Sequence, residues 1–190
     1  MGRKSSYDEQ DVFSCVAHEL AAHGRLTVEA LAAATGLSMG SIYHRFGSRE
    51  GVLGEAWLNA IERFQTVFLV ALAPGTLAAG LDAALATPRF CRSNPDEAVL
   101  LACCRQSEFL VAATPAPLRS RIEQANDGVS RAMRRFAAAV DRPLVACSLA
   151  LVAYPLGAVR LYLPARPVPR ELDAELAKAV RAALRGEGDR

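Results

Sequence analysis

Histidine is scarce in this 190-residue chain: it occurs only as His18, His23 and His44. The longer C-terminal part therefore has none, and few of its acidic residues are clustered. Zinc sites draw on histidine, cysteine and carboxylate ligands, and a hydrolytic triad needs a histidine base. We therefore expect no metal site, no cofactor and no catalytic centre, which argues against an enzyme.

Cysteine is present but forms no metal-binding spacing. The five residues are Cys15, Cys91, Cys103, Cys104 and Cys147. An odd number in a chain expected to be cytosolic indicates free thiols. Adjacent residues on a helix point in different directions, so Cys103 and Cys104 are poorly placed to bridge each other. We interpret them as small buried hydrophobic residues, with a thiol sensor as the alternative.

Long apolar runs are also missing. Crossing a bilayer takes about 20 apolar residues, and the longest candidate, Pro143–Leu163, is interrupted by Ser148, Pro155 and Arg160. The N-terminal segment is polar and lacks the pattern of a signal peptide. These features predict a cytoplasmic protein without membrane contact.

Hydrophobic residues make up 52% of the chain, and none of its segments alternates with the period of a strand. This pattern predicts an all-α protein of about nine helices. Four are expected in the N-terminal part, at 8–23, 27–35, 38–44 and 48–73. A short helix at 76–86 and a loop at 87–94 follow, and then helices at 95–113, 115–140, 143–163 and 170–184. Residues 186–190 are expected to be a disordered tail.

The segment Leu26–Leu53 reads as a helix-turn-helix that leads into a further helix. Thr27 is suited to cap its first helix, and Gly36 supplies the positive φ needed just past the end of that helix. Ser38 is suited to cap the second helix, and Ser48 the long helix that follows. In such a unit the second helix lies in the DNA major groove, while the first crosses the backbone.

The residues around this motif closely resemble the DNA-binding domain of the TetR family of bacterial transcriptional regulators, over roughly residues 8–56. The matching positions are Thr27, Val28, Leu31, Ala32, Gly36, Leu37, Ser38, Ser41, Ile42, Tyr43, Phe46, Ser48, Arg49, Glu50 and Leu53. The resemblance implies an N-terminal three-helix DNA-binding domain (1–50). It also implies a C-terminal helical bundle (51–185) that binds an effector and dimerises.

Eight residues are expected to contact double-stranded DNA: Thr27, Ser38, Met39, Gly40, Ser41, Tyr43, His44 and Arg49. Residues 38–41 would face the bases, because they begin the recognition helix. The others would contact phosphates. The alternatives are a core position for Tyr43 and an inert surface position for His44.

Overall charge supports DNA binding only weakly, since the net charge is +2 and the pI is about 8.4. A strongly cationic nucleic-acid binder would usually carry more positive charge. The positive charge must therefore act locally. Arg45 and Arg49 flank the recognition helix, and Arg3 and Lys4 belong to an N-terminal arm that either stays unbound or reaches the minor groove.

The resemblance implies an effector cavity between the long C-terminal helices, which we expect to be enclosed and largely apolar. Its candidate residues are Trp57, Phe64, Arg105, Glu108, Phe109, Tyr154 and Arg160. For the aromatic residues the alternative is plain core packing. For Arg105 and Glu108 it is a solvated polar stripe, and Arg160 has a dimer contact as its alternative. The shortage of histidine and clustered acids favours a lipophilic or aromatic effector.

A homodimer is expected to form through the last two long helices, at about 143–163 and 170–184. Small and apolar residues there suit a four-helix contact: Leu149, Val152, Leu156, Gly157, Leu176 and Val180.

Together these features predict a repressor that a small effector releases from a near-palindromic operator. A ligand-dependent activator is an alternative. A second alternative is a helical ligand-binding or interaction protein whose helix-turn-helix is only structural.

Overall fold

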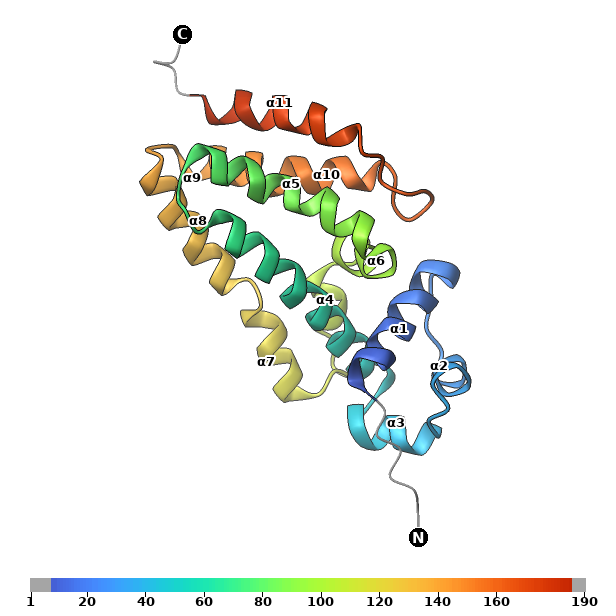
Figure 1. Cartoon of the computed structure of the whole chain (residues 1–190). Helices are drawn as coiled ribbons and strands as arrows, with labels where there is room; N and C mark the ends of the chain where they lie inside the picture. Colours follow the sequence, from blue (N-terminus) through green and yellow to red (C-terminus); the bar gives the residue numbers. More distant parts are fainter. Residues whose placement is uncertain (1–7, 186–190) are drawn as a thin grey trace.

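The computed structural model describes residues 8–185, and this part of the chain is helical with no strand (Figure 1). Counting the interrupted pairs α7–α8 and α9–α10 as one helix each gives nine helices in these residues, as expected. The proposed N-terminal arm (Arg3 and Lys4) and the tail 186–190 lie outside the described residues. In Figure 1 the first three helices form one end of the molecule, and α4 runs from them between the other helices.

The helix-turn-helix forms as the sequence predicts. Its helices are α1 (Glu9–His23), α2 (Val28–Thr35) and α3 (Met39–Phe46). Asp8, Thr27 and Ser38 each precede one of these helices, and each side chain accepts a hydrogen bond from a backbone N–H in the first turn. The predicted glycine end of α2 is also confirmed, since Gly36 has a φ of 70°.

The next helix, α4 (Arg49–Leu72), begins at the predicted cap, because the Ser48 hydroxyl accepts a hydrogen bond from the Gly51 N–H. It packs against α1 and α3 near its start and against α5 and α8 further along. One continuous helix therefore connects the helix-turn-helix to the rest of the bundle.

The predicted loop at 87–94 is wrong, because α5 (Leu77–Ser93) continues through Pro88. Proline inside a helix removes one hydrogen bond and costs about 3 kcal/mol. Burial offsets this cost, since Ala84, Phe90 and Cys91 of α5 are buried against neighbouring helices. Tertiary packing has overridden a local signal here.

The predicted helix at 95–113 is too long. The helix α6 (Pro95–Cys103) ends before Cys104 and Arg105, whose backbones are extended, and a short 3₁₀ turn, η1 (Gln106–Phe109), follows. Arg105 and Glu108 therefore do not project from an apolar helix as assumed. The Gln106 side chain instead donates a hydrogen bond to the backbone carbonyl of Ile122 on the next helix.

The predicted helix at 115–140 is divided into α7 (Ala116–Gln124) and α8 (Asp127–Ala139). The break at Ala125–Asn126 is held by the Gln65 amide of α4, which donates to the Ala125 carbonyl (2.9 Å) and to Asn126 Oδ1 (3.1 Å). This long-range contact sets the position of the break.

The helix predicted at 143–163 spans α9 (Leu144–Ser148), a π-helical turn (Leu149–Ala153) and α10 (Tyr154–Arg160). The Tyr154 N–H donates to the Leu149 carbonyl, five residues earlier. Pro155 follows directly, and a proline ring clashes with the carbonyl four residues before it. The wider π turn relieves this crowding.

The last helix, α11 (Leu172–Leu184), corrects part of the predicted dimer surface. Leu176 and Val180 are buried within the protomer, at 4% and 0% exposure. They pack in the interior of this chain and are not available to a partner. The residues of α9–α10 differ, because Leu149, Val152 and Gly157 are exposed.

Buried apolar residues form two clusters. The proximal core, which includes Ile42 and Leu100, joins α1–α3 to the first half of α4, α6 and α7. The distal core, which includes Phe136 and Val180, joins the second half of α4 to α5, α8, α9 and α11. Phe64 of α4 packs against both clusters. The apolar core is thus continuous across residue 50. The boundary between the proximal and distal cores lies midway along α4.

Candidate DNA-binding surface and ligand cavity

The recognition helix α3 has one buried and one exposed side. Ile42 and Phe46 are buried in the proximal core, so they hold the helix in place. Met39 and Tyr43 are 46% and 49% exposed, which is unusual for such large side chains. The alternative core position for Tyr43 is therefore excluded, and its side chain lies on the exposed side of the helix.

The remaining predicted contact residues of this helix, Gly40, Ser41 and His44, are also exposed. The Ser38 hydroxyl accepts a hydrogen bond from the Ser41 N–H (3.1 Å), and the two hydroxyl oxygens lie 2.9 Å apart. These two side chains therefore form one polar group at the start of α3. Thr27 is exposed at the start of α2, where its oxygen accepts from the Ala30 N–H (3.1 Å).

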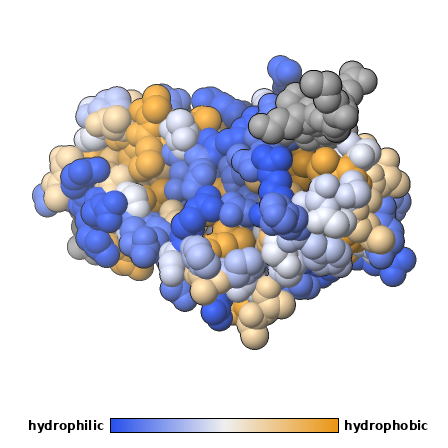
Figure 2. Space-filling model, turned by 90° about the horizontal axis from the view of Figure 1, so that it is seen from below, coloured by the Kyte–Doolittle hydropathy of each residue, from blue (hydrophilic) through white to orange (hydrophobic). Residues whose placement is uncertain are grey.

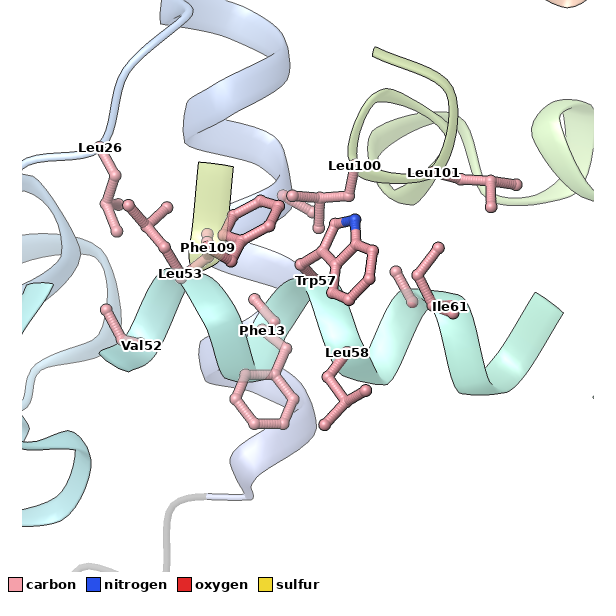
Figure 3. Close-up of a cluster of buried hydrophobic side chains, with 14 of the residues drawn as sticks. Phe13, Leu26, Val52, Leu53, Trp57, Leu58, Ile61, Leu100, Leu101 and Phe109 are labelled. Atoms are coloured by element: carbon pink, nitrogen blue, oxygen red, sulfur yellow. The ribbon is translucent and has the colours of Figure 1, made fainter. Parts of the chain in front are cut away.

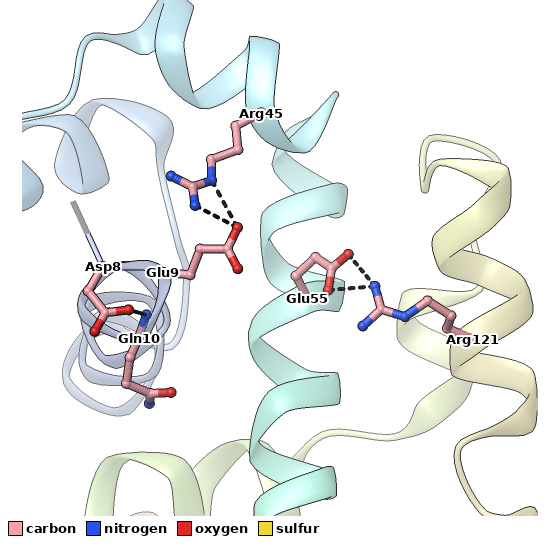
Figure 4. Close-up of polar contacts among 6 residues, drawn as sticks. All are labelled: Asp8, Glu9, Gln10, Arg45, Glu55 and Arg121. Atoms are coloured by element: carbon pink, nitrogen blue, oxygen red, sulfur yellow. Dashed lines mark hydrogen bonds and ion pairs between the residues drawn. The ribbon is translucent and has the colours of Figure 1, made fainter. Parts of the chain in front are cut away.

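Both arginines near the recognition helix are bound within the protein. The Arg45 guanidinium donates twice to Glu9 Oε1 at the start of α1, at 3.0 and 2.6 Å (Figure 4). Arg49 donates through Nε to the Leu26 carbonyl (2.7 Å) and through an η nitrogen to Glu50 (3.2 Å). The positive charge expected beside α3 is therefore partly neutralised.

Arg25 is a cation that the sequence reasoning did not assign to the site. It is exposed just before the α2 cap, and it has no hydrogen bond or ion pair with any other residue in 8–185. Its position next to Leu26 and Thr27 could have indicated that it belongs to the site.

Figure 2 views the molecule from below, the side of α3, and shows hydrophilic and hydrophobic residues together on that face.

A cavity of about 650 Å³ lies where the two cores meet. Ile61 and Leu101 of the proximal core line one part of it, and Phe68 and Met133 of the distal core line another. Phe64 lies between them on α4. The cavity thus lies between α4, α6, α8 and α9–α10, and its volume is in the range of small-molecule sites.

One side of the cavity is exposed. Val145, Leu149 and Val152 line it, and they are 67%, 42% and 41% exposed. The cavity expected from the sequence was enclosed, whereas this one opens along α9 and the π turn.

Of the seven candidate effector residues, Phe64 alone lines this cavity. Trp57 and Phe109 stack on each other with ring centroids 5.2 Å apart in the proximal core (Figure 3). The Trp57 indole Nε1 is buried without a hydrogen-bond partner. The structure therefore places these two aromatic residues in the core.

The polar candidates lie outside the cavity as well. Arg105, Glu108 and Tyr154 are exposed and do not line it. The Arg160 guanidinium donates through Nε to the backbone carbonyl of Ala102 at the end of α6. This contact ties α10 to α6.

Six polar lining residues were missed: Gln65, Thr87, Asn126, Ser148, Ser130 and Arg134. The last two are four residues apart on α8, at the edge of the apolar stripe that includes Met133. Two polar side chains on one edge of an amphipathic helix were a usable signal. Gln65 and Asn126 carried no such signal, because only the long-range contact between α4 and the α7–α8 break brings them together.

Burial makes the thiols poor nucleophiles. It raises the pKa of Cys91 to about 12 and that of Cys104 to about 11, and it also raises the pKa of Cys103. A protonated thiol reacts slowly, which argues against a thiol sensor. The predicted burial of the adjacent pair is nevertheless wrong for Cys103, which is exposed, while Cys104 is partly buried. Across 8–185, no group of three or more histidine, cysteine or acidic residues is arranged to hold a metal ion. In the same range, no helix is both long and apolar enough to cross a membrane.

Residues 17–56 match the sequence profile of bacterial regulatory proteins of the tetR family. This region contains the C-terminal part of α1, all of α2 and α3, and the start of α4. A search of curated protein sequences found no significant match.

Solved structures with the same fold include three TetR family regulators. The regulator from Marinobacter aquaeolei VT8 has a TM-score of 0.67 and 15% identity, and the match covers 93% of each chain. The regulator PfmR from Thermus thermophilus has a TM-score of 0.66 and 20% identity over 93% of this chain and 98% of that one. The regulator from Shewanella sp. PV-4 has a TM-score of 0.65 and 16% identity over 93% and 95%.

Proposed function

We propose that this chain, whose residues 17–56 match the tetR family profile and whose fold resembles that of TetR family regulators, is a homodimeric transcription repressor that a small apolar effector releases from its operator. One observation carries the proposal. The helix α4 begins directly after the recognition helix, and further along it lines the cavity with Phe64 and Phe68. A ligand in the cavity therefore touches the element that holds the DNA-binding motif.

On the DNA, α3 would enter the major groove and its N-terminal residues would face the bases. Met39 is suited to contact a thymine methyl group, and Ser41 to hydrogen-bond a base edge. The Tyr43 hydroxyl, Thr27 and Arg25 would meet phosphates, as would His44. Arg49 would act mainly by holding Leu26, since its Nε is already bound there.

The dimer would form through the exposed side of α9–α10. Val145, Leu149 and Leu161 are 67%, 42% and 72% exposed, a run of apolar side chains that favours association. Small exposed residues on α11, such as Ala182, would let a partner helix approach closely. Two copies related by a twofold axis would present two recognition helices to the half-sites of a near-palindrome.

The cavity would communicate with the DNA surface by two routes. The first is α4 itself. The second is the segment 104–115: the Asn126 amide at the cavity donates to Gln106 Oε1 (3.4 Å), and the Ser48 hydroxyl donates to the Ala113 carbonyl (2.8 Å). A ligand that separates α4 from α8 would shift both contacts. Operator affinity falls if the ligand binds better to the shifted state.

DNA selection with the purified protein tests the first part. We expect a site with two half-sites related by a dyad, and an affinity that falls with salt, because each phosphate contact releases counterions. Equal affinity for random DNA would support the structural helix-turn-helix alternative. A reporter fused to the selected site then separates repression from activation.

Analytical ultracentrifugation tests the dimer. Leu161→Glu places a charge on the proposed surface and should yield a folded monomer, whereas Lys178→Glu on an exposed part of α11 supplies a charge control. A Leu161→Glu variant that remains a dimer would move the interface away from α10.

A further inference from the structure

The polar groups that line the cavity are not equally available to a ligand. The Gln65 amide is bound to Ala125 and Asn126, and the Ser148 hydroxyl donates to the Leu144 carbonyl at 2.8 Å. The donor groups of both side chains are therefore already used within the protein. They offer a ligand less than an unbound donor would.

Within 8–185, Thr87, Ser130 and Arg134 line the cavity without such bonds, and Thr87 is buried, whereas Ser130 and Arg134 lie at the rim. Both line the cavity from α8 and both are exposed. Neither side chain makes a hydrogen bond or ion pair with any other residue in 8–185. Residues four apart lie one above the other on a helix, so this hydroxyl and this guanidinium face the same part of the cavity rim.

The described residues that line the cavity carry positive charge and no negative charge. Arg134 is its one charged residue among those described, and no aspartate or glutamate lines the cavity. The surrounding wall is largely apolar, with Phe64, Phe68 and Leu151 opposite or beside α8. A cationic ligand would meet uncompensated positive charge here, whereas an anionic group would meet a guanidinium and a hydroxyl donor.

We propose that the effector is an amphiphile with an apolar body and a single carboxylate. The carboxylate binds Arg134 and Ser130 at the rim, and the apolar body extends between α4 and the π turn. This inference rests on the proposed function and specifies the ligand class of the same site. It replaces the anchors expected from the sequence, Arg105, Glu108 and Arg160.

The helix α8 provides a matched control. Arg131 is another exposed arginine without a partner in the described chain, one turn from Arg134, but it does not line the cavity. Both substitutions Arg134→Gln and Arg131→Gln remove one positive charge from the same helix. Only a contact at the cavity rim distinguishes their effects.

Isothermal titration calorimetry with dodecanoate, dodecanol and dodecyltrimethylammonium, each below its micelle concentration, tests the inference. Dodecanoate should bind about three- to tenfold more tightly than dodecanol, with the difference shrinking as salt is added, because the rim is exposed. Dodecyltrimethylammonium should bind most weakly. Arg134→Gln should abolish the preference for carboxylate over alcohol, whereas Arg131→Gln should preserve it. Arg134→Lys should retain part of it, which excludes a general loss of folding.

The same three ligands are then tested for release of the selected operator. Equal binding of dodecanoate and dodecanol to the unmodified protein, or equal effects of the two glutamine variants, overturns the carboxylate inference. Release of DNA by both ligands in that case leaves the proposed repressor function standing. If none of the three ligands binds, the carboxylate inference and the apolar effector site both fail.

Discussion

The two halves of the chain begin their helices in different ways. Each helix from α1 to α5 starts with a side chain that caps it: Asp8, Thr27, Ser38, Ser48 and Thr76. None of the helices from α6 to α11 has a side-chain cap. The N-terminal half therefore carries its own start signals, while the helices that form most of the cavity depend on their neighbours. A region held by tertiary contacts is also the region that a ligand can most readily rearrange.

The largest expected effect tests whether α11 belongs to the core. Val180→Glu buries an unpaired carboxylate in the distal core, so the free energy of unfolding should fall by at least about 3 kcal/mol. Lys178→Glu on the exposed side should change it by less than about 1 kcal/mol. Denaturant titration followed by circular dichroism measures both. A stably folded monomeric Val180→Glu variant would instead mean that this side of α11 faces a partner.

A smaller loss of stability is expected when a serine is replaced in a capped helix, and an uncapped helix provides the comparison. Ser48→Ala removes the α4 cap and the hydrogen bond to the Ala113 carbonyl, so stability should fall by about 1–2 kcal/mol. Ser148→Ala removes only a bond to the carbonyl four residues earlier and should cost less than about 0.5 kcal/mol. Thermal unfolding of the two variants gives the comparison. Equal losses of stability in the two variants would contradict the proposed difference between the N-terminal and C-terminal halves of the chain.

Tyr43→Phe should weaken DNA binding by about 1 kcal/mol, or roughly fivefold, on every sequence, because a phosphate contact carries no base information. Ser41→Ala and Met39→Ala should instead change which bases are preferred. Binding to a library of operator variants separates the two outcomes. Tyr154→Phe removes an exposed hydroxyl far along the chain and should leave affinity unchanged. A change of base preference in Tyr43→Phe would reverse the assigned roles.

The smallest effect is expected in the chemical modification of the thiols, which should be slow. Because burial raises the pKa of Cys91 to about 12 and that of Cys104 to about 11, iodoacetamide should modify them slowly at about pH 7.5. The rate should rise about tenfold per pH unit, since the thiolate fraction does so well below the pKa. Mass spectrometry measures the modification, and protein unfolded in urea serves as the fast control. Rapid modification of the folded protein at that pH would revive the thiol-sensor alternative.

The accuracy of the sequence-based expectations follows the same division. The caps at Thr27, Ser38 and Ser48 were predicted and occur as expected, because a cap depends on residues only two or three positions apart. The predicted loop around Pro88 and the uninterrupted helix 115–140 failed. In both places a contact with a helix distant in sequence outweighed the local preference.

The sequence by itself determined the all-α class, the helix-turn-helix and the exposed candidates on α3, since short-range hydrogen bonds and hydrophobic periodicity specify them. Only the tertiary structure decided that Trp57 and Phe109 belong to the core and that Arg45 is paired with Glu9. It also decided that Ser130 and Arg134 border the cavity. A cavity is the space left between helices far apart in the chain, so its lining depends on how those helices pack, which local patterns do not encode.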